Sequence, residues 1–159
     1  MRFSRITHTF FSGLLLCLMA LSAHGNDKII LTVTHGEASE QYSLKQLDAF
    51  PQHDYETKTP WTGRHTFSGP LLKDVMFKSG LVSPRGITAR ALNNYIVDID
   101  LTLIEKYPVI LATRMDGKAM RIRNKGPIWI LFPLDQSPEL DIMEVHGQMV
   151  WQLERLESH

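Results

Sequence analysis

A basic segment followed by a glycine–proline corner is the part of the sequence best suited to chemistry. Four cations lie within residues 115–133, and Gly126-Pro127 comes directly after them; the cations are Lys118, Arg121, Arg123 and Lys125. An arginine donates a planar fork of N–H groups or stacks on a ring face, and a lysine adds a compact positive charge. A glycine lets a ligand approach the backbone closely. These residue types at this spacing predict a binding site for a flat polar or anionic ligand.

Two strands are expected to position this basic segment. Asp116-Gly117 is typical of a hairpin turn, because both residues tolerate a positive φ. Residues 118–123 alternate in the manner of a strand. Residues 128–132 form an uninterrupted apolar run, which predicts a buried strand. We therefore expect a rigid core strand behind the cations, separated from the basic strand by the glycine–proline corner.

A tryptophan outside any apolar period is the second candidate for recognition. Trp61 lies in the Thr-Pro-Trp-Thr loop of residues 59–62, and Arg64 follows closely. An indole in an exposed loop offers a platform on which a flat heteroaromatic ring stacks. The same side chain is also suited to cap the hydrophobic core, and the sequence leaves both interpretations open.

Polar residues between two expected strands are the third candidate. Asn93-Asn94-Tyr95 places two amides together. An asparagine offers a donor and an acceptor at once, which suits the amide-like edge of a nucleobase or a pterin. Asparagine is also an ordinary turn residue. Arg114 adds another cation to the basic segment, which is an ordinary solvated face if no ligand binds there.

Signals for catalysis are weak. The chain contains no Gly-x-Ser-x-Gly sequence, and the histidines after residue 25 lack the short spacing of zinc ligands; they are His35, His53, His65, His146 and His159. Asp98 and Asp100 fall on one face of an expected strand, where a solvated edge is the simpler interpretation. General acid–base chemistry stays open on spacing alone. The sequence favours binding over catalysis.

The first 25 residues have the features of a signal peptide. Arg2 and Arg5 precede an apolar stretch at residues 10–21, and Ala23-His24-Gly25 suits cleavage. The apolar stretch is shorter than the roughly 20 residues that span a bilayer, although an uncleaved anchor is the alternative. We expect a periplasmic protein with one domain, residues 26–159. The single cysteine, Cys17, would leave with the signal peptide.

The mature chain is expected to be a sheet-dominated α+β domain. The chain has 17 basic and 17 acidic residues, a balance that argues against nucleic acid as a partner. Strands are predicted at residues 28–34, 54–59, 62–67, 87–93, 95–99, 108–114, 118–123, 128–132 and 149–156. Helices are predicted at residues 44–50 with Ser43 as the N-cap, at 71–78 with Pro70 in the first turn, and at 101–106, and residues 138–145 are ambiguous.

Several short motifs together resemble the molybdopterin-binding domain of the sulfite oxidase type over most of residues 65–157. They are Phe-Ser-Gly-Pro-Leu-Leu at 67–72, Asn-Asn-Tyr at 93–95, Asp-Gly-Lys at 116–118, Lys-Gly-Pro-Ile-Trp-Ile at 125–130 with Pro133, and Trp-Gln-Leu at 151–153. The molybdenum enzymes of that family bind the metal through a cysteine thiolate, a soft ligand that this chain lacks after export. The resemblance is nearer to standalone periplasmic proteins of this fold that bind a free pterin, because the Thr-Pro-Trp-Thr loop at 59–62 and the Arg-x-Lys-Gly-Pro stretch at 123–127 resemble theirs.

That resemblance implies a function. It implies a non-catalytic protein that binds a reduced, monapterin- or biopterin-like pterin without a metal. It also implies docking on the periplasmic domain of an inner-membrane diguanylate cyclase or phosphodiesterase, and thus control of cyclic di-GMP and biofilm. Two alternatives remain: a molybdopterin-dependent oxidoreductase without the cysteine ligand, and a ligand-free docking module.

The expected ligand-binding residues follow from the resemblance and the candidates above. They are Trp61 for stacking, Asn93, Asn94 and Asn124 for the polar edge, Arg64, Arg114, Arg121 and Lys125 for oxygen atoms, Gly126 for close approach, and Thr62 and Tyr95 beside them. Two positions depart from the family pattern, because Asn94 and Asn124 stand where aspartate is expected. An asparagine cannot offer the forked acceptor of a carboxylate, a loss of about 1.5–3 kcal/mol per charged contact. Binding is then weaker or retuned, unless Asp116, Asp98 or Glu56 supplies the acid.

Overall fold

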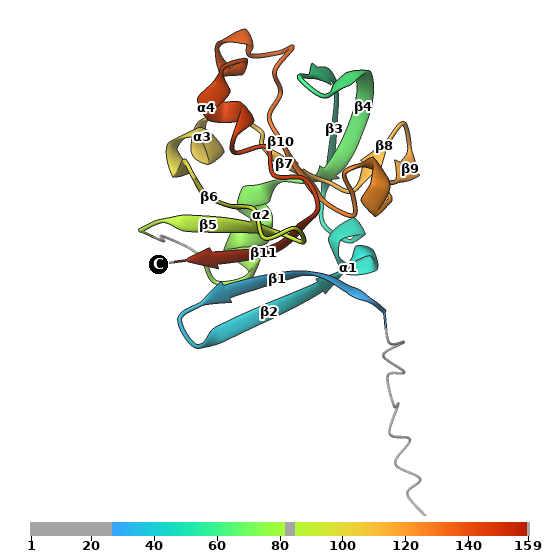
Figure 1. Ribbon diagram of the computed structural model, residues 1–159. Helices are drawn as coiled ribbons and strands as arrows, with labels where there is room; N and C mark the ends of the chain where they lie inside the picture. The colour runs from blue at the N-terminus through green and yellow to red at the C-terminus, as the bar shows by residue number, and fades with distance from the viewer. Residues whose placement is uncertain (1–26, 82–84, 159) are drawn as a thin grey trace, which may run out of the picture.

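The computed structural model describes residues 27–81 and 85–158, and the predicted signal peptide at residues 1–25 lies outside them. The described residues form eleven strands, four α-helices and two 3-10 helices (Figure 1). The strands are β1 (Ile29–His35), β2 (Ala38–Ser43), β3 (Gln52–Thr59), β4 (Thr62–Pro70), β5 (Ile87–Ala91), β6 (Ile96–Ile99), β7 (Ile110–Ala112), β8 (Arg114–Met115), β9 (Lys118–Ala119), β10 (Trp129–Leu131) and β11 (Leu153–Ser158). The helices are α1 (Leu44–Asp48), α2 (Leu72–Lys78), α3 (Leu101–Lys106), α4 (Met143–His146), η1 (Ile122–Asn124) and η2 (Pro138–Leu140). No described helix is both long and apolar enough to cross a bilayer.

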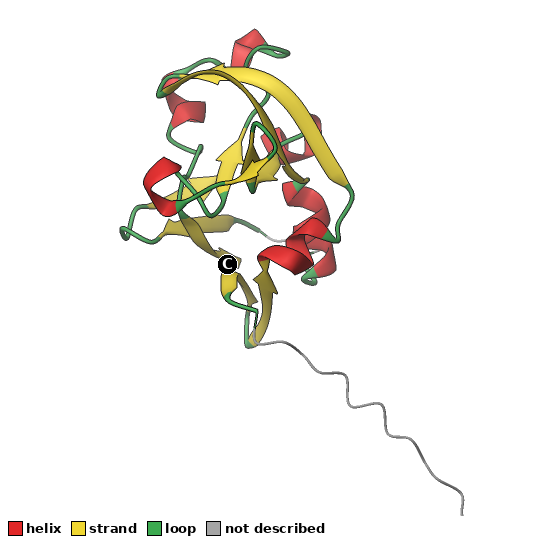
Figure 2. Ribbon diagram, turned by 90° about the vertical axis from the view of Figure 1, so that its right-hand side faces the viewer, coloured by secondary structure: helices red, strands yellow, loops and turns green. Residues whose placement is uncertain are grey.

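The strands form three sheets. A five-stranded sheet has the order β2-β1-β11-β5-β6, in which β1 and β11 run parallel and the other neighbours are antiparallel. A four-stranded antiparallel sheet has the order β3-β4-β8-β9, and β7 pairs with β10 alone. The β7–β10 pair lies between the two larger sheets (Figure 1), and the short helices lie around the strands (Figure 2). The predicted sheet-dominated α+β class is confirmed.

The core is centred on the β7–β10 pair. Every residue of both strands is buried, and Ile128 and Phe132, which flank β10, are completely buried as well. The prediction of a buried strand at residues 128–132 is therefore confirmed. Burial on both faces explains why the sequence there is an unbroken apolar run rather than an alternating one.

Local capping and turn signals predicted several elements correctly. The Ser43 hydroxyl accepts from the Gln46 amide at 3.3 Å, and the Gln46 side chain accepts from the Ser43 amide at 2.8 Å, which is a complete capping box for α1. Asp116 and Gly117 have φ values of 51° and 73°, and they join β8 to β9 as the predicted hairpin turn.

The predicted strand at residues 118–123 is wrong beyond its first two residues. The Met120 side chain is buried and its amide donates to the Thr113 carbonyl at 2.9 Å. The chain then turns into η1, and Lys125 at φ 66° ends that turn. Because Met120 anchors this segment to the core, the cations do not share a strand face.

Several other element boundaries differ from expectation, and hydrogen bonds explain two of these differences. Pro70 is the last residue of β4 rather than part of the α2 first turn, since the Leu72 amide donates to the Val109 carbonyl. The closing strand begins at Leu153 rather than at residue 149. The Val150 carbonyl instead accepts from the Ile130 amide at 2.9 Å, and Trp151 forms an isolated antiparallel bridge with Trp129, so this segment runs beside β10 before it joins the five-stranded sheet.

Asp100→Ala is expected to lower the free energy of unfolding by about 1 kcal/mol. The Asp100 carboxylate caps α3 by accepting from the Thr102 hydroxyl at 2.7 Å and from the Thr102 amide at 2.8 Å. The hydroxyl bond, with the amide bond, holds the pKa of Asp100 below its ordinary value. A lowered folded-state pKa stabilises the fold above the unfolded-state pKa, about 3.9, and this stabilisation is lost as the pH falls through the folded-state value.

Urea denaturation at about pH 7 and about pH 2 measures this capping effect. The wild type and Asp100→Ala should differ at the higher pH and converge at the lower one. Asp54→Ala is the control, because Asp54 is exposed and has no side-chain partner among the described residues. An equal difference at both pH values would contradict the capping role of the carboxylate.

Candidate functional site: an aromatic pocket

A cavity of about 410 Å³ opens at the end of the molecule that carries α4. Four segments that are distant in the sequence supply its wall: the β3–β4 turn, the β5–β6 turn, α4 and the segment that precedes β11. The lining residues are Trp61, Ala91, Asn93, Tyr95, Met143, His146, Gly147, Met149, Val150 and Trp151. The lining is therefore mainly apolar and aromatic, with a few polar groups, as is usual for a small-molecule site.

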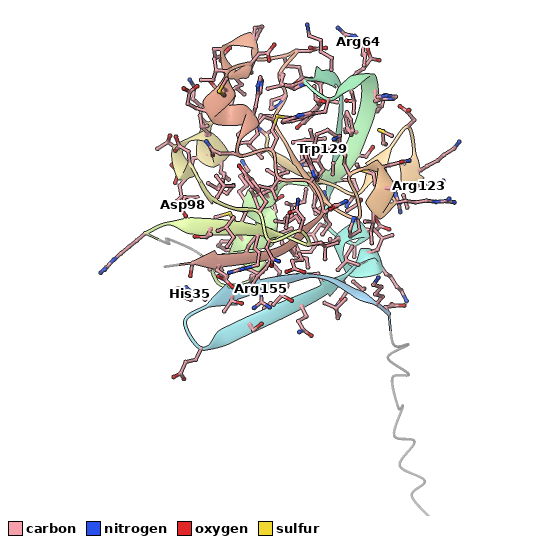
Figure 3. The ribbon with its side chains drawn as sticks, in the orientation of Figure 1. His35, Arg64, Asp98, Arg123, Trp129 and Arg155 are labelled. Carbon is pink, nitrogen blue, oxygen red and sulfur yellow. The ribbon has the colours of Figure 1, made fainter. Side chains whose placement is uncertain are left out.

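Three tryptophans connect this pocket to the core. The ring centroids of Trp61 and Trp151 are 4.9 Å apart with an interplanar angle of 82°, and Trp129 lies 6.1 Å from Trp61 and 6.3 Å from Trp151. Trp129 is completely buried near the middle of the molecule (Figure 3), and its Nε1 donates to the Met149 carbonyl at 3.0 Å. Edge-to-face packing fixes the indoles relative to one another. Trp61, the most exposed of the three rings, is therefore held in place by Trp129 and Trp151.

Trp61 is held at the pocket mouth by its own turn. The side chain is 40% exposed and lines the cavity, while other parts of the indole contact Trp151, Trp129 and His146. The Thr59 hydroxyl accepts from the amides of Trp61 at 3.2 Å and Thr62 at 3.0 Å, and it lies 2.9 Å from the Thr62 hydroxyl. The two interpretations of Trp61 from sequence both describe part of its position, since it covers the buried Trp129 and also lines the cavity.

Lys125 places a cation against the tryptophans. Its Nζ lies 3.8 Å from the Trp151 ring centroid, 5.3 Å from that of Trp129 and 5.6 Å from that of Trp61. These are cation–π distances. The partial burial of the ammonium lowers the pKa of Lys125 from its ordinary value. The backbone fixes this position, because the Lys125 carbonyl accepts from the Gln152 amide at 2.9 Å.

His146 gives the pocket a polar side chain that sequence reasoning missed. Its ring lies 6.1 Å from the Trp61 ring, and its Nε2 is 2.8 Å from the Asp141 carboxylate. A carboxylate bonded to one ring nitrogen orients the imidazole and leaves the other nitrogen for a further partner. The sequence signal for His146 is the aspartate five positions earlier, which is too common a pattern to identify a site.

The predicted polar edge at residues 93–95 is partly in the pocket. Asn93 and Tyr95 line the cavity, whereas Asn94 occupies the turn itself with φ 65°. The Asn93 side-chain oxygen accepts from the Tyr95 amide at 3.0 Å, and the Tyr95 hydroxyl donates to the Gly147 carbonyl at 2.9 Å. The amide nitrogen of Asn93 has no partner among the described residues, so it is available to a ligand.

The predicted arginines are not gathered at this pocket. Arg64 bonds to Asp135 at 2.6 Å and approaches Glu56 at 3.5 Å on the outer side of β4 (Figure 3). Arg114 bonds to Asp48 at 2.6 Å. The remaining predicted residues also lie outside the lining: Arg121 faces a separate groove, Asn124 lies in η1 and Thr62 bonds to Thr59.

Gly126 is explained by packing of the chain on itself. A Cβ at this position would collide with the backbone carbonyl of Met120, which the buried Met120 side chain holds in place. The glycine therefore permits two backbone segments to approach each other. This packing positions the neighbouring Lys125 over the indoles, whether or not the glycine also approaches a ligand.

None of the three candidate acids lies in the pocket wall. Asp116 bonds to the His65 ring at 2.8 Å, which, together with the Thr66 amide, holds the pKa of that carboxyl below its ordinary value. Asp98 accepts from the Thr88 hydroxyl and Glu56 faces Arg64. Asp141 is the carboxylate that reaches the pocket, and it does so through His146.

Comparison with known proteins supports the fold and leaves the activity open. No protein-family model and no curated protein matches the chain. Among solved structures, the chain is similar to the sulfane dehydrogenase SoxCD from Paracoccus pantotrophus, with a TM-score of 0.61 and 13% identity. The likeness covers 81% of this chain but 37% of the other, so this chain spans little more than a third of its neighbour. The fold is therefore of the predicted sulfite-oxidase molybdopterin-domain type.

A thiolate-bound molybdenum does not fit the residues that are present. The one cysteine of the chain, Cys17, lies outside the described residues, and within them no three His, Cys, Asp or Glu side chains are grouped to hold a metal ion. Molybdenum in enzymes of this fold type needs a soft sulfur ligand from the protein. The lining instead offers indoles, an amide and an imidazole, which suit an organic heterocycle. The Lys125 ammonium group lies against the indoles, outside the lining.

Proposed function

We propose that this chain is a non-catalytic, periplasmic pterin-binding protein that signals to an inner-membrane enzyme of cyclic di-GMP metabolism. The observation that carries the proposal is the pocket of about 410 Å³ with Trp61 and Trp151 in its wall and Lys125 against both rings. A pterin is a flat bicyclic heterocycle with oxo and amino groups along its edge. Its ring face suits an indole, and its edge suits the amide of Asn93 and the ring of His146.

The charge at the pocket favours a neutral or anionic ligand. An aromatic pocket can also bind a quaternary ammonium group through cation–π contacts. Here the Lys125 ammonium already lies on the Trp151 face, 3.8 Å from its centroid, and none of the described lining residues carries a carboxylate. A second cation would be repelled. The exocyclic oxygen of a pterin, or a phosphate on its side chain, would instead accept from Lys125.

The absence of a carboxylate from the described lining predicts modest affinity or altered specificity. Asn93 supplies one carbonyl oxygen and one amide nitrogen, and its oxygen already accepts from the Tyr95 amide. The 2-amino and ring N–H groups of a pterin would therefore lack a forked acceptor. We propose that the pocket selects a reduced, monapterin- or biopterin-like pterin chiefly by ring stacking and by its oxygen atoms.

The signalling part of the proposal is supported by the resemblance and the leader. The Thr-Pro-Trp-Thr turn and the Lys-Gly-Pro corner resemble those of standalone pterin-binding proteins, and they lie close together, with Lys125 Nζ 5.6 Å from the Trp61 ring centroid. The N-terminal 25 residues have the composition of a signal peptide. In this proposal the pterin-loaded protein docks on the periplasmic domain of a diguanylate cyclase or phosphodiesterase and thereby controls biofilm formation.

A molybdopterin-dependent oxidoreductase is the second candidate function. The observation in its favour is the likeness to SoxCD, a sulfane dehydrogenase. The donor groups argue against it, because residues 27–158 contain no cysteine. Metal analysis of protein isolated from its own periplasm separates the two candidates, since a stoichiometric molybdenum content with turnover of a substrate would overturn the pterin-binding proposal.

Titration of the mature protein with tetrahydromonapterin is the direct test of the proposed function. We expect saturable quenching of tryptophan fluorescence, because the ligand would lie against Trp61 and close to the other two indoles. Guanosine and a non-aromatic sugar are the control ligands for general stacking and for side-chain hydroxyls. Quenching that rises linearly with ligand, without saturation, would contradict a binding site.

A ligand-free docking module would also give linear quenching without saturation. Native mass spectrometry of the isolated protein would then show no bound small molecule.

A further inference from the structure

A second hollow lies behind the aromatic pocket. It has a volume of about 370 Å³ and runs between the start of β1, the segment around η1 and the start of β11. Its lining residues are Lys28, Ile29, Ile30, Leu31, Thr32, Leu92, Met120, Arg121, Ile122, Pro127, Leu153, Glu154 and Arg155. We call it the β1 groove. Ala91 and Asn93 line the aromatic pocket while Leu92 lines the β1 groove, so one short segment forms a wall of both.

One side of the β1 groove is a strand edge without a neighbouring strand. The parallel pairing of β1 with β11 begins at Thr32, opposite Arg155. Residues 28–30 precede that register, and among the described residues no strand lies beside them on the β11 side, although Ile29 pairs with β2 on the other edge. An unpaired edge of this kind is a template to which an extended chain adds by main-chain hydrogen bonds.

The floor of the groove exposes large aliphatic side chains. Ile29, Leu92 and Ile122 are 42%, 44% and 51% exposed, and all three line this groove. The half-buried Pro127 adds to this apolar surface, and the buried Leu153 lies beneath it in the lining. Exposed aliphatic side chains gathered in one hollow mark a surface that a partner covers.

The rim of the groove is positively charged. Lys28 and Arg121 have no ion-pair partner among the described residues, and Arg155 has Glu157 at 3.5 Å. Glu154 is the single acidic residue of the described lining. Because the whole chain is balanced at 17 basic and 17 acidic residues, this local excess gives the groove a preference for negative charge.

We propose that the β1 groove binds an extended, acidic segment of another protein, which adds to the unpaired edge of residues 28–30 at the start of β1. The segment inserts an aliphatic side chain between Ile29 and Ile122, and its carboxylates pair with Arg121 and Lys28. The main-chain hydrogen bonds supply affinity. Every second side chain of the bound segment points into the groove, and the fit of these side chains supplies specificity. The unpaired edge, the exposed aliphatic side chains and the positive rim do not depend on a ligand in the aromatic pocket.

The shared wall adds a consequence that rests on the proposed function. The Gln152 amide donates to the Lys125 carbonyl, and the Gln152 side chain donates to the Ile122 carbonyl at 2.9 Å. Lys125 contacts the indoles of the ligand pocket, while Ile122 lines the β1 groove. A ligand that moved Lys125 would therefore act on Ile122 through Gln152 and could couple the pocket to the groove.

Photocrosslinking in the cell that produces the protein tests the groove directly. Benzoylphenylalanine at position 122 of the full chain is expected to crosslink to a segment of another protein that carries more acidic than basic residues around an aliphatic one, identified by mass spectrometry. The same probe at position 77 is the background control, because Phe77 is 70% exposed and lies outside both hollows. Adduct yield at position 122 no higher than at 77, an adduct with a second copy of this chain, or an adduct with a neutral or basic segment would overturn the proposal.

Charge reversal supplies the matched variants. Arg121→Glu should reduce the adduct yield about tenfold, through repulsion of the acidic segment. Arg123→Glu should leave the yield within about twofold, because Arg123 is exposed on the same segment, points away from the molecule (Figure 3) and does not line the groove. Equal losses in both variants would overturn a site-specific contact. In the tetrahydromonapterin titration, Arg121→Glu should bind the ligand as the wild type does. If the wild type showed no saturable binding, the proposed function would be overturned, whereas the groove proposal would still stand on the crosslinking result.

Discussion

Trp61→Ala is expected to weaken pterin binding about 30-fold, which corresponds to about 2 kcal/mol. Trp61 is the most exposed of the three clustered tryptophans and stands at the mouth of the pocket. When alanine replaces Trp61, a ligand ring loses the contact area of the indole. It also loses the fixed orientation that the edge contact with Trp151 gives this indole. Removal of one aromatic anchor has an effect of this size in many complexes.

The fold should tolerate this substitution. Trp61 is in a hairpin turn that the Thr59 hydroxyl holds through two backbone amides, and neither bond involves the indole. The loss of edge contacts with two other rings should cost about 1–2 kcal/mol of stability. Circular dichroism should therefore show a folded protein with a modestly lower melting temperature.

Isothermal titration calorimetry with tetrahydromonapterin measures the affinity without relying on the fluorescence of the residue that is removed. Trp61→Phe should retain most of the affinity, since a smaller aromatic face still stacks. Phe77→Ala removes an exposed aromatic ring on α2, outside the pocket, and should behave like the wild type. A folded Trp61→Ala protein whose Kd stays within about threefold of the wild-type value would contradict stacking of the ligand on Trp61.

The parts of the fold that sequence predicted well depend on local interactions. Ser43 and Gln46 are three residues apart and form a capping box, and Asp116-Gly117 forms a two-residue turn from the conformational tolerance of its own residues. Such patterns carry their physical cause within a few positions of the chain. They were therefore visible without knowledge of the tertiary structure.

The parts that failed depend on distant partners. The alternation of residues 118–123 favours a strand, but Met120 is drawn into the core and Gly126 packs on its backbone, so the chain turns instead. The bond of Arg114 to Asp48, 66 positions earlier, was likewise invisible in the sequence. Here tertiary contacts override a local pattern.

The candidate site illustrates the same division. Trp61 and Lys125 were recognisable because a tryptophan in a loop and a lysine beside a glycine stand out in sequence. Trp151 was part of a quoted motif and His146 was only one of several histidines, and neither was identified as a site residue. Both become significant through their distances to Trp61, 4.9 Å and 6.1 Å between ring centroids, which arise from contacts across about 90 positions of the chain.

Gly69→Ala is expected to lower the free energy of unfolding by about 3 kcal/mol or more, or to prevent folding. Gly69 lies in β4 where that strand crosses β7, and a Cβ there would collide with the backbone carbonyl of Leu111. Leu111 cannot move freely, because it pairs with Ile130 of β10 at the centre of the core. The added methyl group must therefore push apart two backbones rather than displace a flexible side chain.

Gly63→Ala is a matched control within the same strand. A Cβ at position 63 would meet no atom within 4 Å, and Gly63 has no positive φ. This variant should melt within about 2 °C of the wild type or slightly above it, since alanine restricts the unfolded chain more than glycine does. Thermal unfolding followed by circular dichroism should separate the two variants by about 10 °C or more. If both melted together, the close approach of β4 and β7 would be refuted. Because β10 carries Trp129, the support of the aromatic pocket would then need a different explanation.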